Sequence, residues 1–308
     1  MTSVIYPGQG SQFLGMGKDF FDNFKEAKET FEEIEEATKI DLKKVIFGDD
    51  SRILNTTKYT QISIFTASIV IYKTLETNFG FGSGSYNISH MLGHSLGEYS
   101  ALAASKAISI SQASKLLKKR GDLMNSAVEP NSTSMAALIG MNCMDVEKII
   151  KSHDLKIEIA NDNSPGQVVI SGANLDLQNS EKVFILNGLK KFVKLNVSAA
   201  FHSKFMSEAQ KDLGLEIDKL NFNEPSCGII SNYDASVNSS TKNIITALKF
   251  QMSNRVRWTE SILKLEQTGE KNIVEIGPGK VLSGLVKRIS KNFDIVSINN
   301  LEDLKKIN

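Results

Sequence analysis

The stretch Met91-Leu92-Gly93-His94-Ser95-Leu96-Gly97-Glu98-Tyr99 decides the fold, because it joins a short apolar run to a helical pattern through a glycine-bounded serine. Residues 93–97 fit the Gly-x-Ser-x-Gly nucleophile elbow, a strained strand-to-helix turn that exposes a serine hydroxyl. In this geometry the backbone N–H of Leu96 points to where an oxyanion would form. The plainer alternative is a turn with a surface serine. The strand and helix on either side favour the elbow, so we interpret Ser95 as a nucleophile.

Strand and helix patterns alternate on both sides of this elbow. Apolar runs that end at glycine-rich turns predict strands, and patterns with apolar residues three and four apart predict helices between them. Such alternation is typical of a mainly parallel sheet covered on both faces. The predicted strands outside the elbow are residues 4–6, 228–231 and 272–276, and the last of these turns at residues 277–279 into a helix that starts near Val281.

The pattern changes between residues 129 and 198. The order there is strand, helix, strand, strand, helix, strand, which is that of a ferredoxin-like module. We predict this module as a subdomain at residues 129–198, inserted into a larger α/β domain formed by residues 1–128 and 199–308. The elements are predicted at residues 135–139, 146–152, 156–160, 167–171, 175–189 and 191–197, with a turn at residues 163–166.

Composition excludes several classes of protein. The 308 residues include 36 basic and 35 acidic side chains, so no global field attracts nucleic acid or an anionic membrane. Cys143 and Cys227 have no metal-ligand spacing and are too few for a disulfide framework. We interpret both as small buried apolar groups in a reducing cytoplasm. The chain starts without a signal-like segment, and its most apolar window, residues 62–72, is too short to span a bilayer.

A serine nucleophile needs a base, and histidine is the usual one. The chain has four histidines. His90 belongs to the strand before the elbow, His94 is expected to point away from the neighbouring hydroxyl, and His153 ends a helix of the inserted subdomain. This leaves His202, which lies where the chain re-enters the main domain and can face a cleft.

Arg120 lies on the apolar face of its helix. The helix is predicted from about residue 109 to residue 124, and at 100° per residue Arg120 falls in the middle of a stripe of alanine, leucine and methionine. A buried arginine must be paired. Its partner is either an internal carboxylate or, in the sharper interpretation, a substrate carboxylate bound by the guanidinium.

Taken together, the motifs resemble those of the malonyl-CoA:acyl carrier protein transacylases of type II fatty acid synthesis and the related acyltransferase domains of polyketide synthases. The resemblance covers nearly the whole chain, and each motif is weak alone but specific in this order. The matching positions are residues 7–12, 60–61, 93–99, 120–121, 163–167, 201–203, Gln251, Trp258 and residues 275–279. Proline, frequent in the family after residue 61 and a few residues after Gln251, is absent here.

The resemblance implies an α/β-hydrolase-like catalytic core and a role for each matching residue. Ser95 would carry the acyl group, and backbone carbonyls rather than an acidic residue would hold His202. The amides of Gln9 and Leu96 would form the oxyanion hole. Arg120 would bind the malonyl carboxylate. Gln251 would lie close to His202, and Phe201, in an Ala-Phe-His sequence, is associated with malonyl selection.

The implied function is transfer of malonyl from malonyl-CoA to an acyl carrier protein by a monomeric cytoplasmic enzyme that uses no cofactor or metal. A trans-acting polyketide synthase acyltransferase has the same chemistry with another partner. A serine thioesterase or hydrolase on the same core stays open, as does a non-catalytic protein of this fold. Because carrier proteins of this kind are acidic, we expect a basic docking patch. Its candidates are Arg255, Arg257, Lys280, Lys287 and Arg288.

Overall fold

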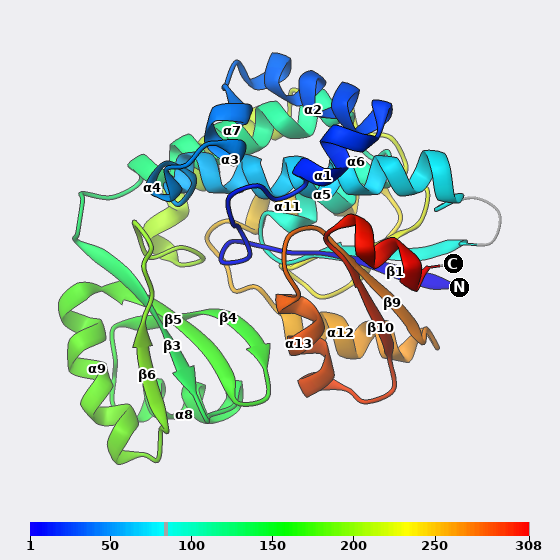
Figure 1. Ribbon diagram of the computed structural model, residues 1–308. Helices are drawn as coiled ribbons and strands as arrows, with labels where there is room; N and C mark the ends of the chain where they lie inside the picture. The colour runs from blue at the N-terminus through cyan, green and yellow to red at the C-terminus, as the bar shows by residue number, and fades with distance from the viewer. Residues whose placement is uncertain (83–85, 308) are drawn as a thin grey trace.

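The computed structural model describes residues 1–82 and 86–307, which form a mixed α/β structure with two separate sheets (Figure 1). Within these residues the larger sheet has six strands in the order β10-β9-β1-β2-β7-β8. All neighbours in it are parallel except β8, which runs antiparallel to β7. The strands are β1 (Thr2–Tyr6), β2 (Ile88–Gly93), β7 (Gly228–Ile230), β8 (Val237–Asn238), β9 (Asn272–Ile276) and β10 (Asp294–Ile298).

Helices bury both faces of the parallel sheet. Because side chains alternate along a strand, Ile5 of β1 faces one layer while Val4 and Tyr6 face the other. The layer against Ile5 contains α12 (Trp258–Gln267) and α13 (Val281–Ile289). The opposite layer contains α1 (Lys18–Asn23), α2 (Lys25–Thr38), α3 (Leu42–Phe47), α4 (Ser51–Leu54), α5 (Thr57–Phe79), α6 (Gly97–Ala104), α7 (Ile110–Ser126), α10 (Ser207–Ile217) and α11 (Thr241–Phe250). Two short 3-10 helices, η1 (Lys204–Met206) and η2 (Leu301–Lys306), complete the chain.

The smaller sheet is antiparallel and projects from one side of the molecule (Figure 1). Its strands have the order β4-β5-β3-β6, and two helices cover one of its faces. The other face carries Met135 and Ala137 into the main core. The elements are β3 (Thr133–Ile139), α8 (Cys143–Ser152), β4 (Ile157–Ser164), β5 (Gln167–Ala173), α9 (Asn174–Leu186) and β6 (Lys191–Lys194).

The antiparallel sheet is hydrogen-bonded to the segment that follows α11. The N–H of Val256 donates to the carbonyl of Ala160 at 2.8 Å, and the N–H of Asp162 donates to the carbonyl of Val256 at 3.0 Å. A short parallel bridge between Asn161 of β4 and Val256 ties the antiparallel sheet to this segment. The two sheets are therefore joined beside the elbow.

The mainly parallel sheet predicted from the sequence is confirmed, and several local predictions are wrong. The predicted turn at residues 163–166 begins too early, because Ser164 still pairs with Gln167 of β5 and only Pro165 and Gly166 turn. The spacing of the apolar residues Phe20, Phe24, Phe31 and Ile34 predicts a single helix, but Phe24 adopts an extended φ of −127° and separates α1 from α2. Strand β10 was not predicted at all. The domain boundaries stay predictions. In the part of the chain that the structure describes, no helix is long and apolar enough to cross a membrane.

Candidate active site

Ser95 lies at the carboxyl end of β2, where parallel sheets commonly carry their sites. Its φ is +52°, the left-handed conformation of a strained elbow. Glycine is required at both flanking positions because neighbouring backbone atoms leave no room for a Cβ. A Cβ on Gly93 would lie 2.0 Å from the carbonyl of Gly97, and one on Gly97 would lie 2.2 Å from the carbonyl of Tyr6. The sequence therefore folds this turn tightly enough to expose the serine hydroxyl.

An asparagine that sequence reasoning missed holds the elbow in place. Asn232 follows β7, the strand next to β2. Its Oδ1 accepts from the N–H of Ser95 at 2.7 Å, and its Nδ2 donates to the carbonyl of Gly93 at 2.7 Å. These two bonds satisfy backbone groups that the left-handed turn removes from the strand ladder. In the sequence, the one indication of this role was the position of Asn232 directly after a predicted strand of the parallel sheet.

His202 lies beside the serine in the position of a general base. Its Nε2 is 2.8 Å from Ser95 Oγ, and its Nδ1 lies 3.0 Å from the carbonyl of Gln251 and 3.2 Å from that of Asn254. Carbonyl oxygens only accept, so Nδ1 carries the proton and Nε2 is free to accept one. Among the described residues, no carboxylate contacts the imidazole. The resemblance had implied this arrangement.

Burial keeps the imidazole neutral. Burial first, and then the positive charge of Arg120, lower the pKa of His202 to about 3. His202 is 4% exposed and has a φ of +55°. A neutral base of this kind is ready to take the serine proton at physiological pH.

The other three histidines do not contact Ser95 Oγ. His94 lines the same cavity but hydrogen-bonds Asn163 through Nε2 at 2.8 Å and packs against Trp258. His90 lies 3.1 Å from the neighbouring Ser89 hydroxyl, and His153 is exposed at the end of α8. The elimination that left His202 therefore agrees with the geometry.

Arg120 is 1% exposed, and α7 directs its guanidinium at the nucleophile. Its Nη2 donates to Ser95 Oγ at 3.0 Å and to Gln251 Oε1 at 3.1 Å, and its Nη1 donates to Gln61 Oε1. Within the described residues, no Asp or Glu forms an ion pair with this guanidinium. The sequence had left open an internal carboxylate as the partner of Arg120, and the described residues provide none. A buried cation with only neutral partners is suited to an anionic ligand.

A cavity of about 100 Å³ lies over Ser95. Leu96, at the start of α6, and Gln9, after β1, both line it, and neither backbone N–H donates to a protein acceptor in the part of the chain described here. Two unpartnered amides beside a nucleophile can bind an oxyanion. Phe201 also lines this cavity, and its carbonyl accepts from Ser171 Oγ of β5 at 2.6 Å. All predicted site residues but Gln251 therefore line one small cavity, and Gln251 contacts Arg120 at its edge.

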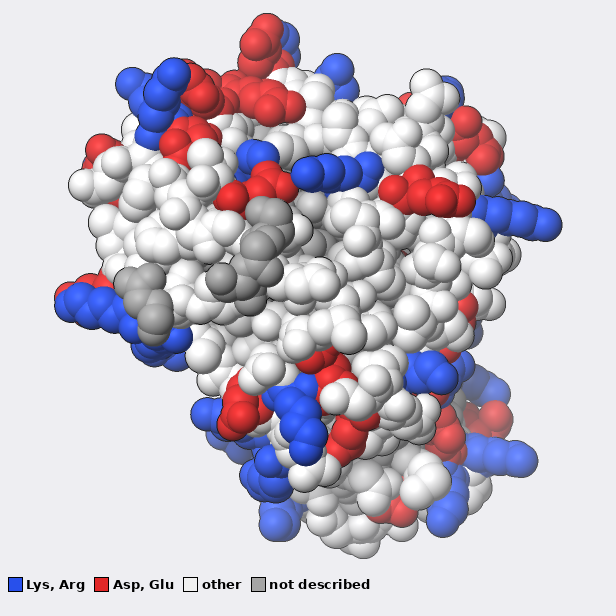
Figure 2. All heavy atoms as spheres, turned by 90° about the vertical axis from the view of Figure 1, so that its right-hand side faces the viewer, with Lys and Arg blue, Asp and Glu red and all other residues white. Residues whose placement is uncertain are grey.

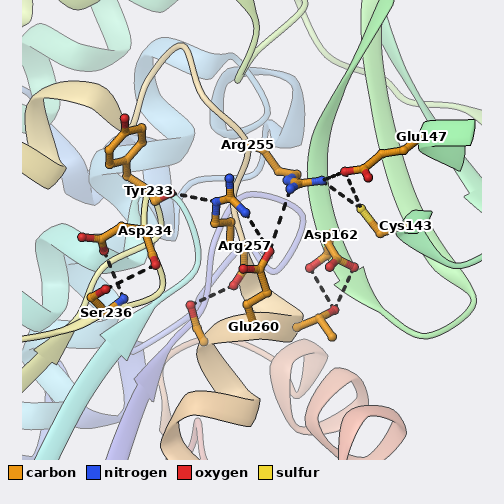
Figure 3. A network of polar contacts seen from close by, with 11 residues as sticks. Cys143, Glu147, Asp162, Tyr233, Asp234, Ser236, Arg255, Arg257 and Glu260 are labelled. Carbon is orange, nitrogen blue, oxygen red and sulfur yellow. Dashed lines mark hydrogen bonds and ion pairs between the residues drawn. The ribbon is translucent and has the colours of Figure 1, made fainter. Parts of the chain in front are cut away.

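A second, larger hollow of about 380 Å³ meets the site at His202. It lies between the antiparallel sheet and the segment after α11, and Arg255 and Arg257 line it. Both arginines are engaged by acidic residues (Figure 3). Arg255 contacts Glu147 at 2.5 Å, and Arg257 contacts Glu260 at 2.9 Å. The acidic partners largely neutralise the positive charges of these two arginines, which makes both weaker candidates for the predicted basic docking patch.

The cysteines do not match their predicted environment. Cys143 and Cys227 are only partly buried. Sγ of Cys143 lies 3.0 Å from Nη1 of Arg255, so this thiol belongs to a polar network (Figure 3). No group of three or more metal-ligating His, Cys, Asp or Glu side chains occurs within the described residues.

Comparison with known proteins supports the chemistry that this geometry suggests. The family model described as acyl transferase domain matches residues 4–305. The chain therefore belongs to the acyltransferase family.

The similar proteins within this family share one activity in their names. The chain is 35% identical over 306 residues to the malonyl CoA-acyl carrier protein transacylase of Bacillus subtilis, with 98% of this chain and 95% of that protein covered. It is 37% identical to a crystal structure of the Clostridium perfringens transacylase of that name, with a TM-score of 0.92 and coverage of 99% and 95%. It is also 32% identical, with a TM-score of 0.94 and coverage of 99% and 98%, to a malonyl-transacylase solved in complex with its type II polyketide acyl-carrier protein.

Proposed function

We propose that this chain transfers malonyl from malonyl-CoA to the phosphopantetheine thiol of an acyl carrier protein, and so supplies fatty acid elongation. One observation carries the proposal. A buried guanidinium that has no anionic partner among the described residues lies 3.0 Å from a serine hydroxyl, which is hydrogen-bonded to a neutral histidine. The histidine and serine supply acyl transfer, and the guanidinium supplies recognition of an acyl group that ends in a carboxylate.

In the first half-reaction Ser95 Oγ attacks the thioester carbonyl of malonyl-CoA while His202 Nε2 takes its proton. The amides of Gln9 and Leu96 stabilise the oxyanion. Collapse breaks the carbon–sulfur bond, and the proton on His202 passes to the departing thiolate of coenzyme A. Malonyl-serine is left in the cavity, with its carboxylate bound by Arg120.

The second half-reaction is the reverse of the first with another thiol. His202 takes the proton of the carrier's phosphopantetheine thiol, the thiolate attacks the malonyl-serine ester, and the proton returns to Ser95 Oγ. The 380 Å³ hollow that meets the site at His202 is the route we assign to the pantetheine arm. The 100 Å³ cavity is far smaller than the roughly 300–1,000 Å³ typical of drug-sized ligand pockets, which suits a short acyl group.

This proposal extends to the fold and setting of the protein. We assign the parallel sheet to an α/β-hydrolase-like core and the antiparallel sheet to a ferredoxin-like subdomain. The β4-β5-β3-β6 order, with α8 and α9 on one face, supports the second assignment. We also propose a cytoplasmic monomer whose partners are malonyl-CoA and the carrier protein rather than nucleic acid or membrane.

Mass spectrometry of the acyl-enzyme tests the function. The protein is incubated with malonyl-CoA, methylmalonyl-CoA and acetyl-CoA side by side, and adducts on Ser95 are measured over time. The proposal expects a persistent malonyl adduct that a carrier protein clears faster than water does. Clearance by water at an equal rate would identify a hydrolase instead. Parallel reactions with fatty-acid and polyketide carrier proteins distinguish the two pathways.

A further inference from the structure

We propose that Glu98 is a positioning residue that orients Gln251 toward Arg120 and, through Asn232, holds the Ser95 elbow. The inference rests on the proposed function, because it concerns how the guanidinium is held for a malonyl carboxylate. Glu98 lies in the first turn of α6, three residues after the nucleophile, and is fully buried.

Glu98 receives two hydrogen bonds on one oxygen. Its Oε2 accepts from Nε2 of Gln251 at 2.7 Å and from the backbone N–H of Asn232 at 3.1 Å. Its Oε1 is buried and has no protein partner among the described residues. A carboxylate that was needed only for stability would be expected to have both oxygens satisfied. The arrangement instead directs one oxygen at two residues of the site.

The bond to Gln251 determines which way its amide faces. A glutamine amide has donors at one end and an acceptor at the other. Nε2 of Gln251 donates to Glu98 and to the carbonyl of Ser95 at 2.8 Å, so Oε1 faces Arg120 and accepts from Nη2 at 3.1 Å. If the amide were reversed, its donors would meet the guanidinium donors. Glu98 therefore acts on the guanidinium through one intervening side chain.

The second bond connects Glu98 to the elbow. The backbone of Asn232 is held by Glu98, while the side chain of Asn232 contacts the backbone of Ser95 and Gly93. The carboxyl group of Glu98 therefore helps to position both the Ser95 elbow and the Arg120 guanidinium. Glu98 forms no direct ion pair with Arg120, so the guanidinium keeps its capacity for an incoming carboxylate. Burial raises the pKa of Glu98 to about 7.

The test compares malonyl and acetyl loading of Ser95 in variants of the full-length chain. Glu98→Leu removes the acceptor for both bonds, and hydrogen bonds to charged groups are strong enough that we expect malonyl kcat/KM to fall about 10-fold or more. An acetyl group has no carboxylate for Arg120 to bind, so acetyl loading is expected to fall less and the malonyl-to-acetyl ratio to decline. Glu98→Gln keeps one oxygen acceptor and is expected to restore most of that ratio.

Glu275 provides a matched control. It is also a fully buried carboxylate, but it accepts from Leu282 and Ser283 at the start of α13, away from Ser95. Glu275→Leu is expected to lower the melting temperature without changing the malonyl-to-acetyl ratio. A merely structural role for Glu98 would give the same pattern as this control.

A double-mutant cycle with Gln251→Leu completes the test. If Glu98 acts through Gln251, the Glu98 substitution changes the ratio little once Gln251 is gone. An unchanged ratio in Glu98→Leu, or effects of the two substitutions that simply add, would overturn the proposal. Should Glu98→Leu fail to fold, Glu98→Asp shortens the side chain by one methylene and is read by the same ratio. Absence of malonyl-serine in the unaltered protein would instead reject the proposed function itself.

Discussion

Replacement of Arg120 by alanine separates recognition of the acyl group from the chemistry of Ser95. Arg120 is 1% exposed, and its hydrogen bonds within the described residues go to neutral groups, so the proposed function assigns its charge to a malonyl carboxylate. Removal of one partner of a buried, hydrogen-bonded charge pair costs about 2–5 kcal/mol. At 1.36 kcal/mol per factor of ten, malonyl kcat/KM is expected to fall about 30-fold to 5,000-fold.

Acetyl loading is expected to stay equal or to rise in the same variant. The acetyl methyl group leaves the Arg120 charge buried and unpaired in the unaltered protein, and the alanine variant removes that penalty.

Both rates are measured by rapid quenching and mass spectrometry of acyl-serine over a range of thioester concentrations. Lys119→Ala serves as the control, because Lys119 is the exposed neighbour on the same helix. Equal losses with malonyl-CoA and acetyl-CoA would refute the reasoning, because they would place Arg120 in the common chemistry rather than in carboxylate recognition.

Three further predictions address the base, the elbow and the docking surface. Since burial and the Arg120 charge lower the pKa of His202, acylation should be lost only as the pH falls well below 6.5, and Arg120→Ala should move this acidic limb of the pH–rate profile upward. Asn232→Ala leaves two backbone groups of the elbow without partners; it should cost about 1–3 kcal/mol in thermal unfolding and slow malonyl and acetyl loading alike. Charge reversal of Lys287 and Arg288 should raise the KM for an acidic carrier protein at low ionic strength, and unchanged carrier kinetics would place docking elsewhere.

The structure shortens the set of basic residues that could form the predicted docking patch. Arg255 and Arg257 are paired with acidic residues, which leaves the exposed Lys280, Lys287 and Arg288 as the better candidates. Over the face shown in Figure 2, basic and acidic side chains are interspersed. A nearly balanced count of charges says nothing about which individual side chains are neutralised, so pairing across elements could not be predicted.

Local sequence was sufficient for the residues whose role follows from their immediate neighbours. The elbow could be predicted at Ser95 because its strand, glycines and helix are contiguous, and its φ of +52° agrees. Arg120 could be singled out because helical periodicity alone places a charge on an apolar face. His202 required elimination among four histidines, and this was possible because the other three lie at positions in the sequence that are recognisable as unsuited to the role.

The sequence did not predict the roles of residues that act on the site through tertiary contacts. Gln61 and Glu98 belonged to matching motifs without an assigned role, and Asn232 was not singled out. Each contacts a site residue that is far away in the sequence or on another element: Gln61 meets Arg120 from α5, and Asn232 meets Ser95 from the end of β7. Neither periodicity nor spacing carries that information. The same reason explains why the bridge between Asn161 of β4 and Val256 was not predicted.

The shared surroundings of Arg120 and His202 connect substrate recognition to base strength. The positive charge of Arg120 is the second cause, after burial, of the low pKa of His202. A malonyl carboxylate bound to the guanidinium cancels much of that charge, so the pKa of His202 must rise when malonyl is bound. A higher pKa makes the imidazole a stronger base. Acetyl groups provide no such compensation. On the proposed function, the guanidinium would therefore favour malonyl in two ways: it would bind the malonyl carboxylate, and the bound carboxylate would weaken the positive field that lowers the pKa of His202.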